Sequence, residues 1–114
     1  MQGALISRWT GIVPGREAAA RQLMLDTNAF TDKLAAEGRI TDFAWYLSAH
    51  SADGLTITRG EMEHLMAITA DQEFLALVTR ARLILTGSSW GFFATGDSVE
   101  PRANLLEQAA AQLG

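Results

Sequence analysis

The chain has 114 residues, a net charge of −4 and 48% hydrophobic residues, which suits one folded domain over residues 1–114 and argues against disorder. It contains no basic run of the kind that nucleic acid requires, and no apolar run approaches the roughly 20 residues of a membrane span. The lack of cysteine excludes disulfides and thiolate sites, and without a signal-peptide pattern we expect a soluble, cytoplasmic protein.

The segment Ala4–Ile12 is expected to form the first strand. Successive side chains of a strand point to opposite faces, which places Leu5, Ser7 and Trp9 on one side and Ile6 and Arg8 on the other. Neither side is purely apolar, so the pattern does not decide which one faces the core. Pro14-Gly15 is expected to end the strand.

A long amphipathic helix is expected over Arg16–Glu37. Its apolar side chains recur at about 100° per residue, which is the helical period. Gly38 can adopt the left-handed conformation that closes a helix. The stripe consists of Ala20, Leu23, Met24, Thr27, Phe30, Thr31 and Leu34.

The stretch Ile40–Gly60 is typical of a β-hairpin, and we expect the other elements to be arranged around it. Large apolar side chains alternate in its first half, and Leu55–Thr58 alternates again with β-branched residues. Asp53-Gly54 lies between them and supplies residues that tolerate a positive φ angle. The loop is longer than two residues, so the sequence does not fix the register of the hairpin.

The second half of the chain predicts two further helices, a strand and a terminal helix. Glu61–Thr69 favours a short helix, although a continuation of the preceding strand is the alternative. Asp71 is a suitable N-cap for a helix whose apolar stripe ends with Ile84 and Leu85, before Gly87. Ser88–Thr95 predicts the last strand, and Pro101 suits the start of a helix. The apolar side of that helix is Leu105, Leu106, Ala109, Ala110 and Leu113.

The predicted order of elements is βαββαβ with an extra C-terminal helix. This order favours an α+β fold of the ferredoxin-like type, with a four-stranded antiparallel sheet and helices on one face. With the hairpin closing on Asp53-Gly54 and the run Arg59-Gly60-Glu61 followed by Phe74, the chain resembles the dimeric α+β barrel superfamily. It is most similar to small uncharacterised bacterial members, especially over Gly15–Gly96.

The resemblance implies a homodimer in which two sheets pack face to face. It implies no particular reaction, because the superfamily includes cofactor-free monooxygenases, haem-degrading enzymes, isomerase-like members and proteins without known activity. The haem-degrading branch has a helical His, an Asn on the first strand and a Trp on the third. Since Ala4–Ile12 lacks Asn and Leu55–Arg59 lacks Trp, we expect no haem binding and no other cofactor.

Two side chains are candidates for acid–base chemistry. His64 on the short helix and Tyr46 in the hairpin are the residues that a catalytic function would use. The alternative for His64 is an ordinary surface or half-buried histidine. His50 and His64 lack the spacing of paired metal ligands, so the sequence does not predict a metal site.

The candidate ligand-binding residues are three tryptophans and two arginines. Trp9, Trp45 and Trp90 could line a cavity for a ligand, and their alternative role is core packing. Arg8 and Arg59 would need an anion or an acidic partner such as Asp42 if they faced the interior of a barrel.

The sequence therefore favours a small dimeric barrel without enzymatic activity. It would bind a modest apolar or aromatic molecule or serve as an interaction module, with neither nucleic acid nor membrane as a partner. The alternative is a cofactor-independent monooxygenase or isomerase-like enzyme that uses His64 or Tyr46. We also weigh the helix from Pro101 as a cover for its own sheet, which would keep the chain monomeric.

Overall fold

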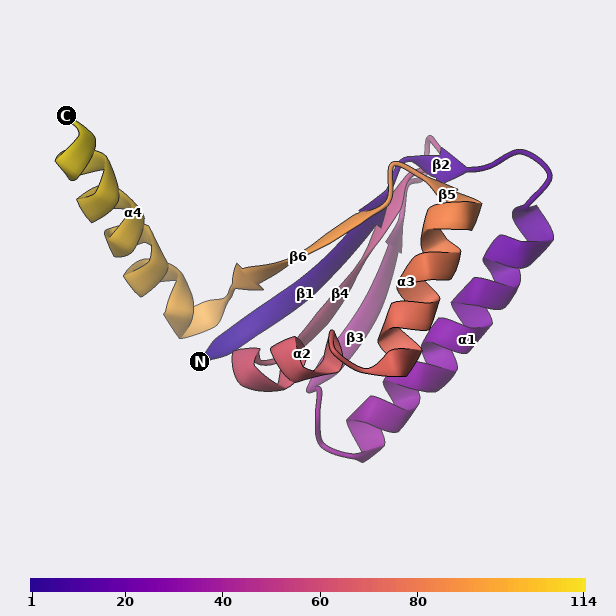
Figure 1. Cartoon of the computed structure of the whole chain (residues 1–114), viewed down its shortest axis with the longest axis horizontal. Helices are drawn as coiled ribbons and strands as arrows, with labels where there is room; N and C mark the ends of the chain where they lie inside the picture. The colour runs from indigo at the N-terminus through magenta and orange to yellow at the C-terminus, as the bar shows by residue number, and fades with distance from the viewer.

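A computed structural model describes all residues, 1–114, and shows a four-stranded sheet with two helices on one face (Figure 1). The strands lie in the order β3-β4-β1-β6, and every neighbouring pair is antiparallel. The strands of this sheet are β1 (Gln2–Trp9), β3 (Asp42–Leu47), β4 (Gly54–Glu61) and β6 (Ser89–Ala94). The helices are α1 (Glu17–Ala36), α2 (Met62–Ile68), α3 (Gln72–Ile84) and α4 (Val99–Leu113). The α+β, ferredoxin-like order predicted from the sequence is confirmed.

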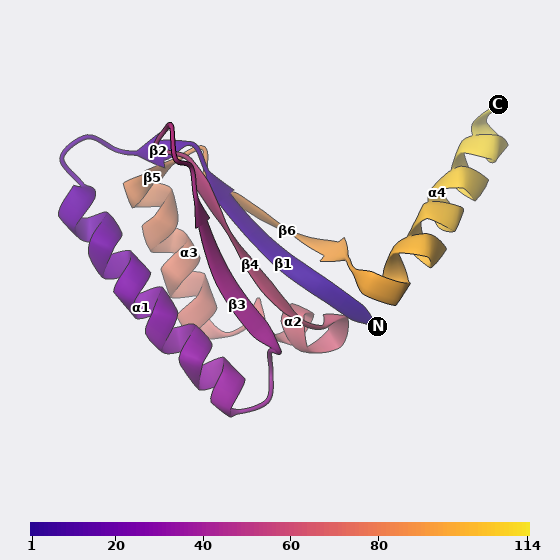
Figure 2. The same ribbon diagram turned by 180° about the vertical axis from the view of Figure 1, so that it is seen from behind.

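The strand register determines which side chains face the helices. Leu5 of β1 lies opposite Thr58 of β4 and Phe92 of β6, and Ser7 lies opposite Thr56 and Trp90. These positions face α1 and α3, whereas the residues between them lie on the other face, which no helix covers (Figure 2). The two faces of β1 could not be ranked from the sequence, and the register settles that question.

The core is concentrated at the end of the sheet where α2 lies. Phe30 and Leu34 of α1 meet Phe74 of α3 there, above Leu5 of β1. Polar contacts join the two helices along their length, with Lys33 to Glu73 at 2.5 Å and Asp26 to Arg80 at 2.8 Å. Seven buried residues form the cluster: Leu5, Phe30, Leu34, Ile40, Leu65, Ile68 and Phe74.

The expected strand over Ala4–Ile12 is divided in two. After β1 the chain bends at Thr10, and β2 (Gly11–Ile12) pairs with β5 (Leu85–Thr86) instead of joining the main sheet. The amide of Thr10 donates to the carbonyl of Thr86 at 2.8 Å, and that of Val13 donates to Ile84 at 2.8 Å. Leu85 was expected to end the helical stripe but belongs to β5. The helix ends at Ile84 because the backbone of Leu85 pairs with Ile12 of β2.

The expected role of Gly54 is also wrong. Gly54 begins β4 opposite Leu47, and its φ angle is not positive. Gly54 is needed because it has no side chain. An added Cβ would lie 2.7 Å from Trp9 and 2.9 Å from the carbonyl oxygen of Tyr46. The expectation for Gly38 is confirmed, since its φ of 73° closes α1.

The terminal helix α4 projects away from the sheet and the other helices (Figures 1 and 2). All its side chains are exposed, so it does not cover its own sheet as the monomeric alternative required. Ser98 holds the start of α4 in place. Its hydroxyl lies 2.6 Å from the carbonyl oxygen of Gln2 and accepts a hydrogen bond from the amide of Thr95 at 3.0 Å. No helix of the chain combines the length and apolarity needed to cross a membrane.

We predict that Leu34→Ala lowers the free energy of unfolding by about 3 kcal/mol, because the side chain is 1% exposed and its loss leaves a void in the core. Urea denaturation measures the change. Leu25→Ala on the same helix is the matched control, since Leu25 is 53% exposed and its removal should change stability by less than about 0.5 kcal/mol. Equal losses for the two variants would contradict this placement of the core.

Candidate functional site

A cavity of about 840 Å³ lies between the sheet and the two covering helices. It continues from the core toward the end where β2 pairs with β5, and most of the residues that line it are hydrophobic. Its volume is in the range of small-molecule sites, which is roughly 300–1,000 Å³.

The cavity exists because both layers carry small side chains at its centre. On the sheet these are Ser7 of β1 and Thr56 of β4, which lie opposite one another. On the helices they are Ala20 of α1 and Ala81 of α3. At the other end Phe30, Leu34 and Phe74 fill the space between the same layers, so the layers touch there and remain apart here.

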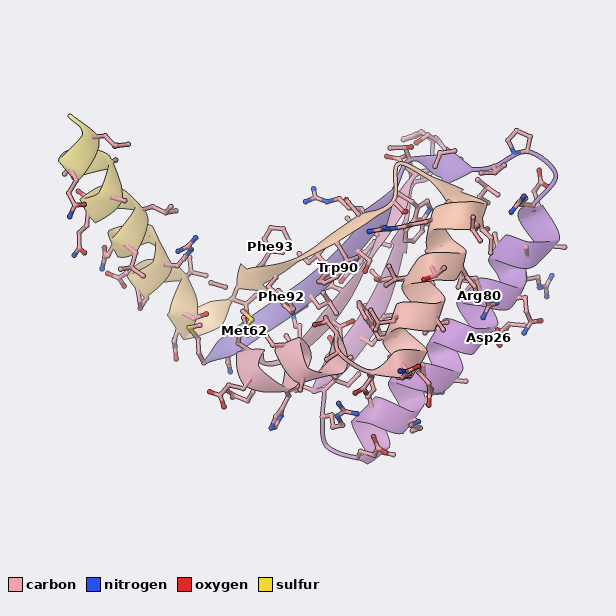
Figure 3. All side chains as sticks on the ribbon, viewed as in Figure 1. Asp26, Met62, Arg80, Trp90, Phe92 and Phe93 are labelled. Atoms are coloured by element: carbon pink, nitrogen blue, oxygen red, sulfur yellow. The ribbon has the colours of Figure 1, made fainter.

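Aromatic side chains form the two side walls of the cavity. On one side the indole of Trp45 meets the ring of Trp9 with centroids 6.0 Å apart and that of Phe43 at 5.6 Å. On the other side Trp90 meets Phe74 at 5.4 Å, edge to face. Figure 3 shows Trp90 and Phe92 on the helix side of β6 and Phe93 on its other side. The floor between the walls carries hydroxyl groups, so a flat ring would have aromatic surface on both flanks and polar atoms at one edge.

One wall is tied to the helix layer by a hydrogen bond. The indole nitrogen of Trp45 donates to the amide oxygen of Asn28 on α1 at 2.8 Å. This bond sets the orientation of the half-buried indole and links β3 to α1. The sequence did not predict a role for Asn28, because it lies outside the apolar stripe of α1. The signal that could have found it is a polar residue at the edge of that stripe, one turn from Met24.

Charged and hydroxyl side chains surround the open end of the cavity. They come from the end of β1, the start of α1, the loop between β3 and β4, the end of α3 and the start of β6. None of the five ion pairs of the chain involves them. The exposed members are Arg8, Glu17, Arg21, Ser48, Ser51, Asp53, Arg82 and Ser89.

The displaced pKa values of the protein belong to surface ion pairs. A hydrogen bond from Arg80 lowers the pKa of Asp26, and Figure 3 shows these side chains meeting between α1 and α3. A hydrogen bond to Glu61 raises the pKa of the Met1 amino group, and the same bond lowers the pKa of the Glu61 carboxyl. These groups lie outside the cavity lining.

The structure brings the three predicted tryptophans together around the cavity and leaves the two predicted acid–base residues apart from it. Trp9, Trp45 and Trp90 all line the cavity. Tyr46 is 51% exposed on the open face of the sheet, and His64 lies on the exposed side of α2. Neither belongs to the cavity lining, and they come from different ends of the sheet.

Neither predicted arginine points into the cavity between the sheet and the helices. Arg8 reaches the rim of the cavity, but its guanidinium lies over the ring of Phe93 on the open face, 5.8 Å from the ring centre. Arg59 is exposed on that face opposite Asp42 in the register, and no ion pair joins the two. No group of three or more His, Asp or Glu side chains is placed to hold a metal ion.

Solved structures share this fold at low sequence identity. Rv0793 from Mycobacterium tuberculosis is 20% identical with a TM-score of 0.69, over 87% of this chain and 99% of that one. SnoaB from Streptomyces nogalater, a cofactor-independent oxygenase, is 17% identical with a TM-score of 0.66, over 86% and 96%. A dimeric ferredoxin-like protein of unknown function from Thermobifida fusca is 16% identical with a TM-score of 0.58, over 82% and 92%.

At these identities the likeness establishes the fold alone, which is that of the dimeric ferredoxin-like proteins. The ferredoxin-like fold predicted from the sequence is thereby confirmed. No known family matches the sequence, and no curated protein matches it either.

We predict that the hydrogen bond between Trp45 and Asn28 couples the two residues by about 1 kcal/mol. Trp45→Phe and Asn28→Ala should each lower the free energy of unfolding, and the double variant should lose less than the sum of the two. Chemical denaturation of the four proteins measures the coupling. The control cycle pairs Trp9→Phe with Asn28→Ala, which share no hydrogen bond and should be additive.

Proposed function

We propose that the protein binds a flat apolar or aromatic molecule in the cavity between the sheet and the helices, without transforming it. The observation that carries this proposal is a volume of about 840 Å³ flanked by Trp9 and Trp45 on one side and Trp90 on the other. A core packed only for stability leaves few voids larger than a water molecule, so a space of this size suits a ligand.

The absence of catalytic groups inside the cavity supports binding over catalysis. Its charged side chains stand at the exposed rim, and its inner wall carries aromatic rings, aliphatic groups and hydroxyls. A general base must come within hydrogen-bond reach of the proton that it removes, and His64 and Tyr46 lie outside the lining. The alternative is a cofactor-independent monooxygenase or isomerase-like enzyme, and the shared fold of the oxygenase SnoaB is the observation in its favour.

Naphthalene is a suitable probe of the proposed site, because it is flat, apolar and free of polar groups. We expect saturable binding of one molecule per chain in equilibrium dialysis, accompanied by a change in tryptophan fluorescence. Ala81→Phe, which places a ring inside the cavity, should weaken this binding at least about tenfold. Ala76→Phe on the exposed side of the same helix is the matched control and should bind as the unchanged chain does.

Circular dichroism of both variants checks that Ala81→Phe is folded, and Ala20→Phe on α1 fills the same space from the other helix. Absence of saturable binding up to the solubility limit of naphthalene would overturn the proposal. Conversion of a bound aromatic ligand without an added cofactor would favour the enzymatic alternative.

We infer in addition that two copies of the chain pair through the open faces of their sheets. The helices cover one face only, and the other carries aliphatic and aromatic side chains without a cover from α4. A bare apolar face of this kind is rare on a monomer. Two neighbours of the same fold are described as dimeric, which supports the existence of a dimer. The large apolar side chains of this face are Ile6, Tyr46, Leu55, Ile57 and Phe93, and Arg8, Asp42 and Arg59 lie on the same face.

Light scattering coupled to size exclusion should give about twice the chain mass of 12.3 kDa at micromolar concentration. Ile57→Glu should yield monomers, because it buries a charge in the paired sheets, whereas Leu75→Glu on the exposed side of α3 should leave the dimer intact. A chain lacking residues 99–114 that stays dimeric would place α4 outside the main interface. A mass near that of one chain for the full protein would contradict the pairing.

A further inference from the structure

Two threonines on the floor of the cavity stand out among the polar residues of the protein. Thr56 and Thr58 of β4 are only 6% and 7% exposed, and both line the cavity. They are two residues apart on one strand, so their side chains point to the same face, about 7 Å from each other. Ser7 of β1 lies beside Thr56 in the register and adds a third hydroxyl to this floor.

The hydroxyls of these two threonines have no hydrogen-bond partner within the protein. In the helices Thr27 donates to the carbonyl of Leu23 at 2.7 Å, and Thr79 donates to that of Leu75 at 2.8 Å. No such bond is formed by Thr56 or Thr58, and yet neither oxygen is a sealed and unsatisfied atom. Both oxygens are therefore reachable from the one open space beside them, which is the cavity.

A hydroxyl at these positions brings the folded chain no advantage that valine would not bring. Valine has nearly the same shape and is likewise favoured in strands, whereas a hydroxyl that loses its water to an apolar ligand and gains no partner costs about 1–3 kcal/mol. A ligand atom that bonds to the hydroxyls removes this cost, because the bond replaces the water that each oxygen loses on burial.

The neighbours of the two hydroxyls indicate what that atom is. Thr56 lies opposite Trp45 across the strands, and Thr58 lies opposite Phe43, so the hydroxyls meet the edge of a ring that packs against this wall. A threonine hydroxyl both donates and accepts, which suits a carbonyl or a hydroxyl oxygen. The charged side chains stand at the rim instead of the floor, so the group bound at the floor is neutral.

We propose that Thr56 and Thr58 select ligands with a neutral oxygen at the inner edge of an aromatic ring, as in an aromatic alcohol or ketone. This inference rests on the proposed function, since it assumes that the cavity takes an aromatic ligand. It adds a specificity element to that site, because a hydrocarbon of the same size leaves both hydroxyls without partners.

Naphthalene and 2-naphthol, which differ by one hydroxyl, test the inference as a pair. The ratio of their dissociation constants is measured by equilibrium dialysis for the unchanged chain and for the double variant Thr56→Val/Thr58→Val. We expect the preference for 2-naphthol to fall about five- to tenfold in the variant, through weaker binding of 2-naphthol alone. Comparing ratios cancels the different hydration of the two probes, because that difference is the same for both proteins.

Two controls separate a loss of hydroxyls from a change of shape. Thr56→Ser/Thr58→Ser keeps both hydroxyls and should keep the preference, and Thr79→Val on α3 should leave both affinities unchanged. Circular dichroism and a cooperative thermal transition without ligand check that the valine variant is folded. The single variants Thr56→Val and Thr58→Val give intermediate ratios if both hydroxyls contribute.

The outcomes distinguish this inference from the function on which it rests. If naphthalene binds and the ratio is the same in the valine variant, the hydroxyls do not select the ligand, and only this inference is overturned. If neither probe binds to the unchanged chain, the proposed function fails and the inference fails with it. A ratio that falls equally in the serine variant would assign the effect to packing and would also contradict the inference.

Discussion

The structure depends on a contact between the helix layer and the sheet that is made at one end only. Phe30, Leu34 and Phe74 close this end over Leu5, and α2 adds Leu65 and Ile68 from the side. Large side chains there set the separation of the two layers. Where the facing residues become Ser7, Thr56, Ala20 and Ala81, the same separation leaves an open space. The cavity therefore results from the change in side-chain size between the packed end and the open end, on α1 and α3 as well as on the sheet.

The two faces of the sheet differ in chemistry as well as in cover. The helix side carries aromatic rings at its two edges and hydroxyls in the centre. The open side carries aliphatic and aromatic groups together with Arg8, Asp42 and Arg59, and Arg8 lies over Phe93. The alternation along each strand lets one sheet present two surfaces of different chemistry.

The sequence predicted the fold well because the patterns that decide it are local. The alternation around Trp45, the helical stripe through Phe30 and the glycine after α1 are each complete within a few turns or strand residues. Leu85 was assigned wrongly because it continues the helical period while its backbone pairs with Ile12, a contact that no local pattern shows. Likewise Gly54 has the composition of a turn residue but is needed for its close contact with Trp9.

The candidate site was less accessible to such reasoning. The sequence predicts the tryptophans as possible lining residues, but whether such residues pack in a core or flank a cavity depends on the sizes of side chains on another layer. Thr56 and Thr58 read only as the polar half of an alternating strand, although they are almost wholly buried. These two polar side chains are buried because β4 lies inside the sheet and turns its polar side toward the helices. Only the register shows this orientation.

The position of β1 in the sheet also determines how the chain must fold. This strand comes first in the sequence but lies inside the sheet, between β4 and β6, and Leu5 pairs with Phe92 near the other end of the chain. Pairings between distant residues form slowly, because a long loop must close before any contact compensates for it. On the ribosome the hairpin of β3 and β4 can form early, but the sheet remains incomplete until β6 has emerged. Until then β1 exposes the edge that β6 will cover. In this interval the nascent chain is most prone to aggregate.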